Sequence, residues 1–350
     1  MEVLSHPVNV LDNFNNIKRC KSTSKNFTAI PIVDLLDPDA KTKIVEACKE
    51  YGFFKVINHG FSVEFMEKLE SEAVKFFNLP QLDKEKSGPP NPFGYGNKKI
   101  GLSSDVGWVK YLLFGVGPEI FSKNAQVILP GISESLWSLV NDYVSAVRNM
   151  MCEVLEMITV ELKIGPKDVL SRLIKDEKSD SCFRVNHYPP YPELQPSSDR
   201  ILIGFGEHTD PQISSVLRSN NTSGLQICLK DGTWVSVPPD HSSFFFNVGD
   251  SLQVITNGRF RSVKHRVLTQ SLKSRISMVY FGGPPLSEKI TALSSLMDDG
   301  EEKLYEEFTW SENKKSAYKT RLGENRLGRL KNHMIDLKSQ KLFNMYLYVM

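Results

Sequence analysis

The tripeptide His208-Thr209-Asp210 places an imidazole and a carboxylate two residues apart. On a β-strand, side chains at this spacing project to the same face, with Cα atoms roughly 6.5 Å apart, so both can reach one metal ion. On a helix they would point about 200° apart. The match is weak by itself in a chain with seven histidines, but His265 opens the later segment HRVLT and offers a third ligand. The sequence therefore predicts a metal site made by His208, Asp210 and His265.

Two histidines and one carboxylate are the ligand set of non-haem Fe(II) oxygenases, which leave three metal positions open. Arg275 and Ser277 stand two residues apart in RISMVYF, and a guanidinium beside a hydroxyl suits a carboxylate. Tyr188 in NHYPPYP offers another hydroxyl. An open metal site near a carboxylate anchor predicts a dicarboxylate co-substrate that reaches the metal with its other end. We expect Arg275 to take part in catalysis by holding that co-substrate.

These residues fall in a region whose hydrophobic pattern has a period of two. From Arg184 to Gly282, short strand-like segments are separated by Gly, Asn, Asp and Pro turns. Eight segments at this spacing are typical of a sandwich or a double-sheet jelly roll. We therefore expect a mainly β fold with flanking helices around a jelly-roll core. The eight segments are ILIGF, ISSVLR, LQICL, TWVSV, SFFFNV, LQVIT, HRVLT and RISMVYF.

The N-terminal part has a mixed pattern. IPIVDL and FFKVINHG are expected to be short strands. Asp37 is expected to cap a helix that has Pro38 at its first position and stops at Gly52. Ser62 is expected to cap a second helix that runs to about Phe77.

A Pro-, Gly- and Lys-rich stretch from Pro80 to Ser104 is expected to be a long loop. Between Gly131 and Gly165, apolar residues step by three and four, which predicts a long amphipathic helix. The chain is again helical and charged after Pro285. The expected organisation is a tail (1–27), an N-terminal helical module (28–105), a linker with the long helix (106–179), a jelly-roll domain (180–283) and a C-terminal helical segment and tail (284–350).

Composition limits the possible partners. The 350 residues carry 43 basic and 41 acidic side chains, which gives no reason to expect nucleic acid binding. Five scattered cysteines, none in CxxC spacing, indicate reduced thiols in a cytoplasmic protein. No run of eighteen apolar residues occurs, and the first thirty residues lack an apolar core, so we expect neither a membrane span nor a secretory signal.

The motifs together resemble a known family, the Fe(II)- and 2-oxoglutarate-dependent dioxygenases. HTD, His265 and RIS match its metal and co-substrate signatures, and IPIVDL, EACKEYGFFKVINHG and NHYPPYP resemble its plant branch. The resemblance covers about residues 28–325. It implies a double-stranded β-helix, which is a jelly roll, wrapped by helices, with Fe(II) at one mouth. It further implies O2 and 2-oxoglutarate as co-substrates and ascorbate as a supporting reductant. In this resemblance His208, Asp210 and His265 bind iron, while Tyr188, Arg275 and Ser277 bind the distal carboxylate of 2-oxoglutarate.

A narrower resemblance is to the gibberellin 2-oxidases that act on nineteen-carbon gibberellins. It rests on GYGNKKIG, SDVGWVKYLL, GFGEHTDPQISSVLRSNNTSGLQI and FTWSENKKSAYKTRL. It implies 2β-hydroxylation of the hormone, a small-molecule partner and no protein partner. Tyr191, Ser104 and Lys110 depart from the common pattern of the family and bear on substrate fit and stability.

A gibberellin pocket needs apolar walls and at least one cation or hydrogen-bond donor for the carboxylate. Candidate substrate residues are Lys98, Lys99 and Trp108 in the middle of the chain and Tyr318 near its end. Three alternatives stay open: a related plant oxygenase acting on a flavonoid or another hormone, an aminocyclopropane-carboxylate oxidase type that uses ascorbate in place of 2-oxoglutarate, and an inactive jelly roll that serves as a binding module.

Overall fold

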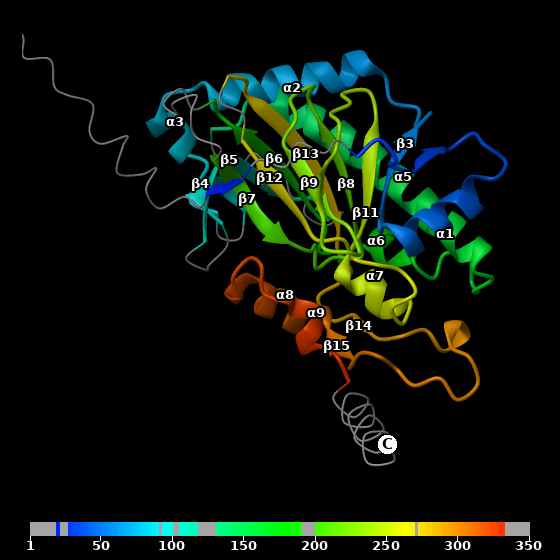
Figure 1. Ribbon diagram of the computed structural model, residues 1–350. Helices are drawn as coiled ribbons and strands as arrows, with labels where there is room; N and C mark the ends of the chain where they lie inside the picture. Colours follow the sequence, from blue (N-terminus) through cyan, green and yellow to red (C-terminus); the bar gives the residue numbers. More distant parts are fainter. Residues whose placement is uncertain are drawn as a thin grey trace, which may run out of the picture.

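Two β-sheets form the centre of the molecule, and helices cover one of them (Figure 1). The computed structural model describes residues 19–21, 27–90, 93–100, 105–117, 131–190, 200–269 and 272–332. The larger sheet has the strand order β2 (Ile32–Asp34), β3 (Phe53–Ile57), β11 (Phe244–Val248), β8 (Ser214–Ser219), β13 (Arg275–Gly282), β6 (Cys182–Tyr188), β5 (Val106–Gly115) and β4 (Gly94–Lys99). The smaller sheet has the order β1 (Arg19–Lys21), β7 (Arg200–His208), β12 (His265–Leu268), β9 (Leu225–Cys228) and β10 (Trp234–Ser236).

All neighbouring strands of both sheets are antiparallel except β2 and β3, which run parallel. Strands that are distant in sequence lie side by side, as β12 does between β7 and β9. This is the mainly β, jelly-roll core with flanking helices that the sequence predicts. The larger sheet takes β2, β3, β4 and β5 from residues before 180, so it extends beyond the segment in which the sequence placed the barrel.

Seven of the eight expected strand segments are strands, and LQVIT is not. It lies in the helix α7 (Asp250–Ile255), which begins after Gly249. Nearly all of its side chains are buried, among them Leu252, Val254 and Ile255. A short apolar segment that is buried on all sides has no amphipathic period to distinguish a helix from a strand.

The stretch from Pro80 to Ser104 is not one long loop in its described part. It contains the short helix α3 (Gln81–Glu85) and the edge strand β4, which pairs with β5. The Gly- and Lys-rich sequence of β4 is poor in strand-forming residues, so the strand depends on this pairing. Lys98, with φ of 61°, marks an irregularity in that pairing. Tertiary contacts therefore override local composition here.

Three helices cover the larger sheet: α1 (Ala40–Glu50), α2 (Val63–Phe77) and α5 (Glu134–Glu161). Ser62 caps α2 by accepting a hydrogen bond from the Phe65 amide at 3.1 Å, as the sequence predicts. The predicted cap of α1 was wrong: the helix begins at Ala40, and Asp37 instead accepts a hydrogen bond from the amide of Asp39. Pro38 therefore lies in the turn before the helix.

Hydrophobic side chains fill two spaces. The first lies between α1, α2 and α5 and the larger sheet, with Tyr143 and Phe244 among its fully buried members. The second lies between the two sheets and includes Phe205, Val267 and Tyr188. The first core supports the sheet from outside, and the second surrounds the interior of the barrel.

The C-terminal segment lies across one end of the sheets, in orange and red in Figure 1. It has a two-stranded sheet of β14 (Lys289–Ile290) and β15 (Phe308–Thr309), then α8 (Trp310–Lys319) and α9 (Arg326–Arg329). Thr309 and Glu312 form a reciprocal capping box at the start of α8. Residues 301–307, which the sequence placed in a helix, are not helical.

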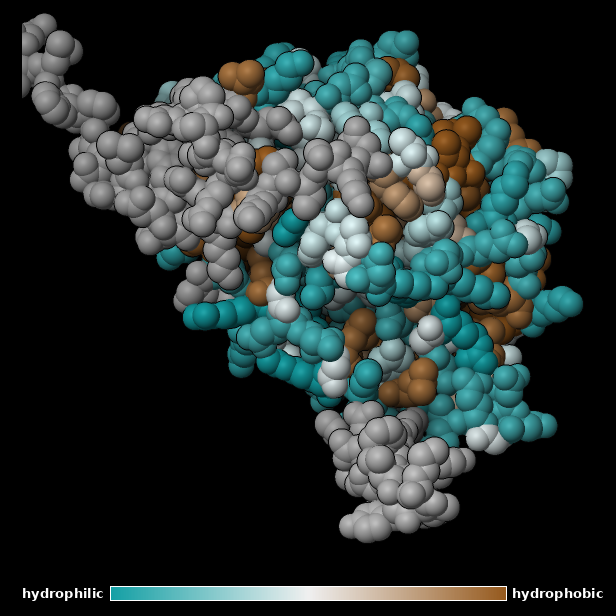
Figure 2. All heavy atoms as spheres, in the orientation of Figure 1, coloured by the Kyte–Doolittle hydropathy of each residue, from teal (hydrophilic) through white to brown (hydrophobic). Residues whose placement is uncertain are grey.

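The face of the molecule shown in Figure 2 is mostly hydrophilic, with hydrophobic residues in small groups. In the described part of the chain, no helix is long and apolar enough to cross a membrane. The short helix α6 (Arg172–Lys175) packs against α5.

Candidate metal centre and active site

The pairing of β7 with β12 brings the three predicted metal ligands together. His265, the first residue of β12, lies opposite His208, the last residue of β7. Asp210 follows β7 by two residues, and its Oδ1 lies 3.7 Å from Nε2 of each histidine. The potential ligand atoms all lie within 4.8 Å of one another. This geometry allows one ion to contact all three.

Hydrogen bonds fix which nitrogen of each histidine faces Asp210. Nδ1 of His208 lies 2.8 Å from the carbonyl oxygen of Gly206, and Nδ1 of His265 lies 3.2 Å from that of Val263. A carbonyl oxygen only accepts, so each Nδ1 carries the proton and each Nε2 keeps a lone pair. Two neutral imidazole nitrogens and one carboxylate oxygen are suitable ligands for Fe(II).

Two buried side chains hold Asp210 in place. Ser215 and Asn247 donate hydrogen bonds to Oδ2 at 2.5 and 2.7 Å. Oδ1 is left to face the two histidines. The carboxylate is therefore oriented before any metal binds.

A second set of contacts fixes the turn that carries Asp210. Thr209 donates to Asp250 Oδ2 at 3.0 Å, and Ser262 donates to Asp250 Oδ1 at 2.7 Å. The amide of Asp250 donates to the carbonyl of Asp210 at 2.7 Å. Arg326 of α9 donates to the carbonyl of Thr209. The buried Asp250 thereby ties the Asp210 turn to the chain just before His265.

Burial and mutual proximity set the charge states of the site. Burial, followed by the neighbouring His265, lowers the pKa of His208 to about 3, so its imidazole is neutral. Burial would raise the pKa of Asp210. The two imidazoles and the hydrogen bonds from Ser215 and Asn247 outweigh that effect and hold the pKa below its usual value. Both shifts favour the forms that bind a cation, which are the neutral imidazole of His208 and the carboxylate of Asp210.

The predicted co-substrate residues lie close to one another. The strand pairing of β13 with β6 places Arg275 opposite Tyr188 and Ser277 opposite Asn186. Arg275 is only 2% exposed, and its guanidinium carbon lies 5.5 Å from the centre of the Tyr188 ring. Among the described residues, its Nε and Nη1 have no hydrogen-bond partner. A buried guanidinium with free donors fits an incoming carboxylate, as 2-oxoglutarate would supply.

Gly204 of β7 makes room for this arrangement. A Cβ atom at Gly204 would lie 2.6 Å from Cδ1 of the Tyr188 ring. Such a contact is too close for any larger residue unless the ring moves. The smaller sheet therefore approaches Tyr188 closely only because residue 204 has no side chain.

One cavity of about 70 Å³ contains both groups of residues. Its lining comes from both sheets and includes the three metal ligands, Tyr188, Arg275 and Ser277. Apolar side chains make much of the remaining wall: Phe53, Phe205, Leu217, Leu225, Val267, Val279 and Phe281. A metal and an anionic co-substrate would therefore meet in a largely apolar interior.

The predicted substrate residues are not brought together at the metal cavity. Lys98 lies over the Trp108 ring, with Nζ 4.9 Å from its centre, and neither residue lines the metal cavity. By strand alternation, Trp108 faces away from the barrel interior, because its neighbour Val109 belongs to the core between the sheets. Tyr318 is half-buried on α8 and does not line the metal cavity; burial raises the pKa of its hydroxyl.

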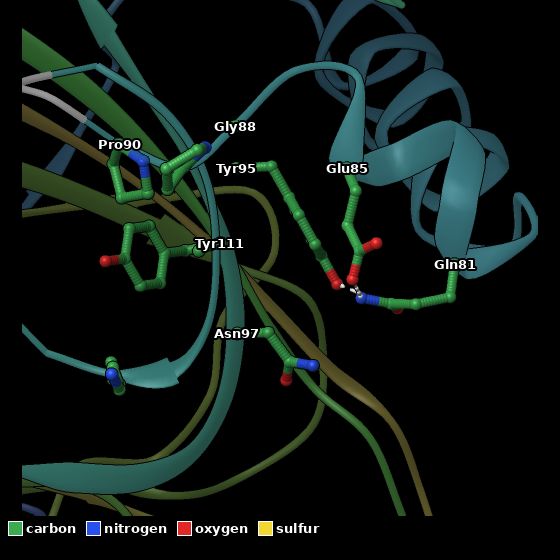
Figure 3. Close-up of a pocket in the computed structure, with 10 residues that line it drawn as sticks. Gln81, Glu85, Gly88, Pro90, Tyr95, Asn97 and Tyr111 are labelled. Carbon is green, nitrogen blue, oxygen red and sulfur yellow. Dashed lines mark hydrogen bonds between the residues drawn. The ribbon is translucent and has the colours of Figure 1, made fainter.

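Lys99 lines a second, larger cavity of about 510 Å³ beside the edge strand β4 (Figure 3). Gln81 bridges the Glu85 carboxylate and the Tyr95 hydroxyl in its wall. The Tyr111 ring also lines it, with its hydroxyl pointing away from Tyr95. Of the two predicted lysines, Lys99 thus belongs to this outer cavity and Lys98 does not line it.

Some predictions fall on other parts of the chain. Tyr191, Ser104, most of the N-terminal tail and residues 333–350 lie outside the described residues. Lys110 is half-buried on β5, and burial lowers its pKa.

The sequence interpretation missed several residues of the site. Ser215 and Asn247 orient Asp210, Asp250 braces its turn, and Arg184 and Asn186 line the cavity from β6. A signal existed for β6, because Arg184, Asn186 and Tyr188 alternate in sequence and so share one strand face. No sequence pattern indicates Ser215 and Asn247. They lie side by side at Asp210 because β8 pairs with β11.

Comparison with known proteins agrees with this geometry. Residues 179–284 match the family model of the 2OG-Fe(II) oxygenase superfamily, and residues 30–128 match the model described as non-haem dioxygenase in morphine synthesis N-terminal. A crystal structure of JOX2 in complex with 2OG, Fe and JA is 26% identical, with a TM-score of 0.79. The similarity covers 94% of this chain and 96% of that one.

Curated relatives are similar over nearly the whole chain. A gibberellin 2-beta-dioxygenase of Phaseolus coccineus is 57% identical over 96% of this chain and 100% of its own length. Gibberellin 2-beta-dioxygenase 1 of Pisum sativum is 60% identical over 86% of this chain and 90% of its own length. The chain therefore belongs to the 2OG-Fe(II) oxygenases, in the family of the gibberellin 2-beta-dioxygenases, and is an Fe(II)- and 2-oxoglutarate-dependent dioxygenase.

Proposed function

We propose that this protein hydroxylates gibberellins at the 2β carbon and so inactivates the hormone, with nineteen-carbon gibberellins as its substrates. One observation carries the proposal. Five relatives named gibberellin 2-beta-dioxygenase are 51–60% identical over at least 86% of the chain. The metal and co-substrate residues of the site have the geometry that such a reaction needs.

Each group of residues has a separate task. His208, Asp210 and His265 would hold the iron, which when bound would supply the oxidising chemistry of the reaction, with 2-oxoglutarate and O2 consumed and succinate and CO2 formed. Arg275 holds the distal carboxylate of 2-oxoglutarate through its free donors, beside the hydroxyl groups of Tyr188 and Ser277. These contacts keep the co-substrate in one orientation.

The apolar side chains of the cavity exclude water from the reacting groups. Phe205 packs against His208, with ring centres 4.6 Å apart, and Phe53, Leu217 and Val267 complete the wall. In a dry site the electrostatic contacts of the charged ligands are stronger than in water. Water is also kept from the reactive intermediates.

The decisive experiment is turnover of a gibberellin panel by the purified protein with Fe(II), 2-oxoglutarate and ascorbate. We expect a product heavier by one oxygen atom, with a 2β-hydroxyl group, and an equal amount of succinate. The Asp210→Ala variant serves as the inactive control. If succinate forms with another acid or a flavonoid but no gibberellin is hydroxylated, the substrate assignment is wrong and the oxygenase assignment remains.

We further infer that the enzyme works in the cytoplasm, where its five thiols would stay reduced. A fluorescent fusion expressed in plant cells tests this. Signal confined to a compartment of the secretory pathway would contradict it.

A further inference from the structure

Arg184 is a charged residue of the cavity to which neither the metal nor the co-substrate assigns a task. It lies on β6, two residues before Asn186, and lines the same cavity as His208. Its guanidinium carbon lies 3.8 Å from the centre of the Tyr111 ring and 4.9 Å from that of the Phe205 ring. The Phe205 ring in turn packs on His208. The two aromatic rings therefore hold the guanidinium near the metal ligands.

The hydrogen bonds of Arg184 are incomplete. Its Nε donates to Oδ1 of Asn186 at 2.7 Å. Its Nη2 is shielded from solvent and, among the described residues, has no hydrogen-bond partner. Contact with aromatic faces stabilises a guanidinium only modestly, and a buried donor without a partner is costly. Arg184 therefore has a free donor at Nη2, and a bound ligand could supply the missing acceptor.

A count of charges supports the same conclusion. Of the described residues that line the cavity, Arg184 and Arg275 are the cations and Asp210 is the only carboxylate. Fe(II) adds two positive charges and 2-oxoglutarate adds two negative ones, so these two cancel. Asp210 and Arg275 also cancel. One positive charge, equal to that of Arg184, is left without compensation in a largely apolar cavity.

We propose that Arg184 binds the carboxylate of the substrate. This inference rests on the proposed function, because gibberellins carry a carboxylate. A planar guanidinium forms two parallel hydrogen bonds with a carboxylate, and its free Nη2 offers one of them. The pocket thus selects monoanionic substrates over neutral ones such as flavonoids.

The size of the cavities is consistent with this position. The metal cavity, at about 70 Å³, is smaller than the roughly 300–1,000 Å³ of typical ligand sites. The outer cavity of about 510 Å³ is within that range. Arg184 lines the first and its stacking partner Tyr111 lines the second. A carboxylate held by Arg184 would therefore lie beside Tyr111, whose ring also lines the larger cavity.

The test compares kcat/KM for a gibberellin and for its methyl ester in the wild-type protein and in Arg184→Gln. The ester keeps the ring system of the acid but has no negative charge to pair with a guanidinium. We expect the wild-type protein to prefer the acid by about 30-fold or more, the effect of removing one partner from a buried charge pair. In Arg184→Gln the preference should fall towards unity, and in Arg184→Lys, which keeps the charge but not the fork, to an intermediate value.

Lys230→Gln is the matched control. It removes a cation whose partner is Glu50, at 2.7 Å, with both side chains about half exposed. The acid preference should be unchanged in this variant. The Kd of 2-oxoglutarate, measured without oxygen and with Mn(II) in place of iron, reports whether each variant still assembles the cavity. Where turnover is too low to measure, the Kd values of acid and ester in the same Mn(II) complex replace the kinetic ratio.

Two results would overturn the inference: a wild-type protein that binds and turns over acid and ester equally, or an Arg184→Gln variant that keeps the full acid preference. Failure of the proposed function has a different outcome. In that case no gibberellin is hydroxylated, while another monocarboxylic acid shows an acid preference that Arg184→Gln abolishes.

Discussion

Replacement of Asn247 by leucine should weaken metal binding without changing any metal ligand. Asn247 and Ser215 both donate to Oδ2 of Asp210, at 2.7 and 2.5 Å, and leave Oδ1 directed at the two histidines. Leucine has the same branching and the same number of side-chain heavy atoms as asparagine but no donor. The carboxylate would then be held by Ser215 alone and could turn about its Cβ–Cγ bond.

The size of the effect follows from these contacts. A hydrogen bond to a charged group contributes about 1.5–3 kcal/mol. Loss of a residue that orients a metal ligand typically costs about 10–100-fold in affinity, which corresponds to about 1.4–2.8 kcal/mol. The two ranges agree. Without Asn247, Ser215 is the one described side chain that still donates to Oδ2, so the lost hydrogen bond is not replaced. We expect the Kd of Mn(II) or Co(II) to rise about 10–100-fold in Asn247→Leu.

The assay is a metal titration of the metal-free protein, read by tryptophan fluorescence or calorimetry, without substrate. Asn313→Leu is a suitable control. Asn313 is 7% exposed on α8, and its Nδ2 has no partner among the described residues, so the change also buries a leucine but cuts no hydrogen bond to a metal ligand. A metal Kd within twofold of the wild-type value in Asn247→Leu, with an intact fold, would refute the reasoning.

Three further predictions concern the residues found from the sequence. Each metal ligand should be essential: the variants His208→Ala, Asp210→Ala and His265→Ala should lose turnover but stay folded, because each lacks one of three metal ligands. Activity assays and circular dichroism check this, and full activity of any one variant contradicts it. Arg275→Ala should raise the KM for 2-oxoglutarate by at least about tenfold, because a charge-assisted contact is lost, and should change the metal Kd less. An unchanged KM would show that Arg275 does not bind the distal carboxylate of 2-oxoglutarate. Tyr318→Ala should raise the KM for the gibberellin while 2-oxoglutarate is still decarboxylated without substrate; an unchanged KM would exclude Tyr318 from the pocket.

The sequence could predict the metal and co-substrate residues because their chemistry is written in short patterns. An imidazole and a carboxylate two residues apart share a strand face, and so do Arg275 and Ser277. The structure adds the part that depends on strand pairing: His265 lies opposite His208, and Arg275 lies opposite Tyr188. No local pattern specifies which strands of a jelly roll become neighbours.

The errors have the same origin. The segment LQVIT alternates like a strand, yet it is the helix α7, because burial on all sides makes the hydrophobic period uninformative. The substrate roles of Trp108 and Lys98 stay predictions, and strand alternation turns Trp108 away from the barrel interior. Arg184 was not assigned a role, because an isolated arginine in a strand has no distinguishing neighbour. Its importance becomes visible only when Nη2 is found buried and unpaired.

The C-terminal helix α8 connects substrate recognition to the strand that carries Arg184. At the start of α8, the indole of Trp310 donates to Asp180 at 2.8 Å, and the ammonium of Lys314 lies 2.6 Å from both Asp180 oxygens. Asp180 comes two residues before β6, so these contacts fix α8 against the beginning of the strand. Tyr318 lies one helical turn beyond Lys314, close enough for the charge of Arg184 on β6 to act on its hydroxyl. The metal ligands lie on β7, β12 and the turn after β7, and none of them contacts α8 through these bonds. Changes in α8 can therefore alter which acid is bound while leaving the ligands of the iron in place.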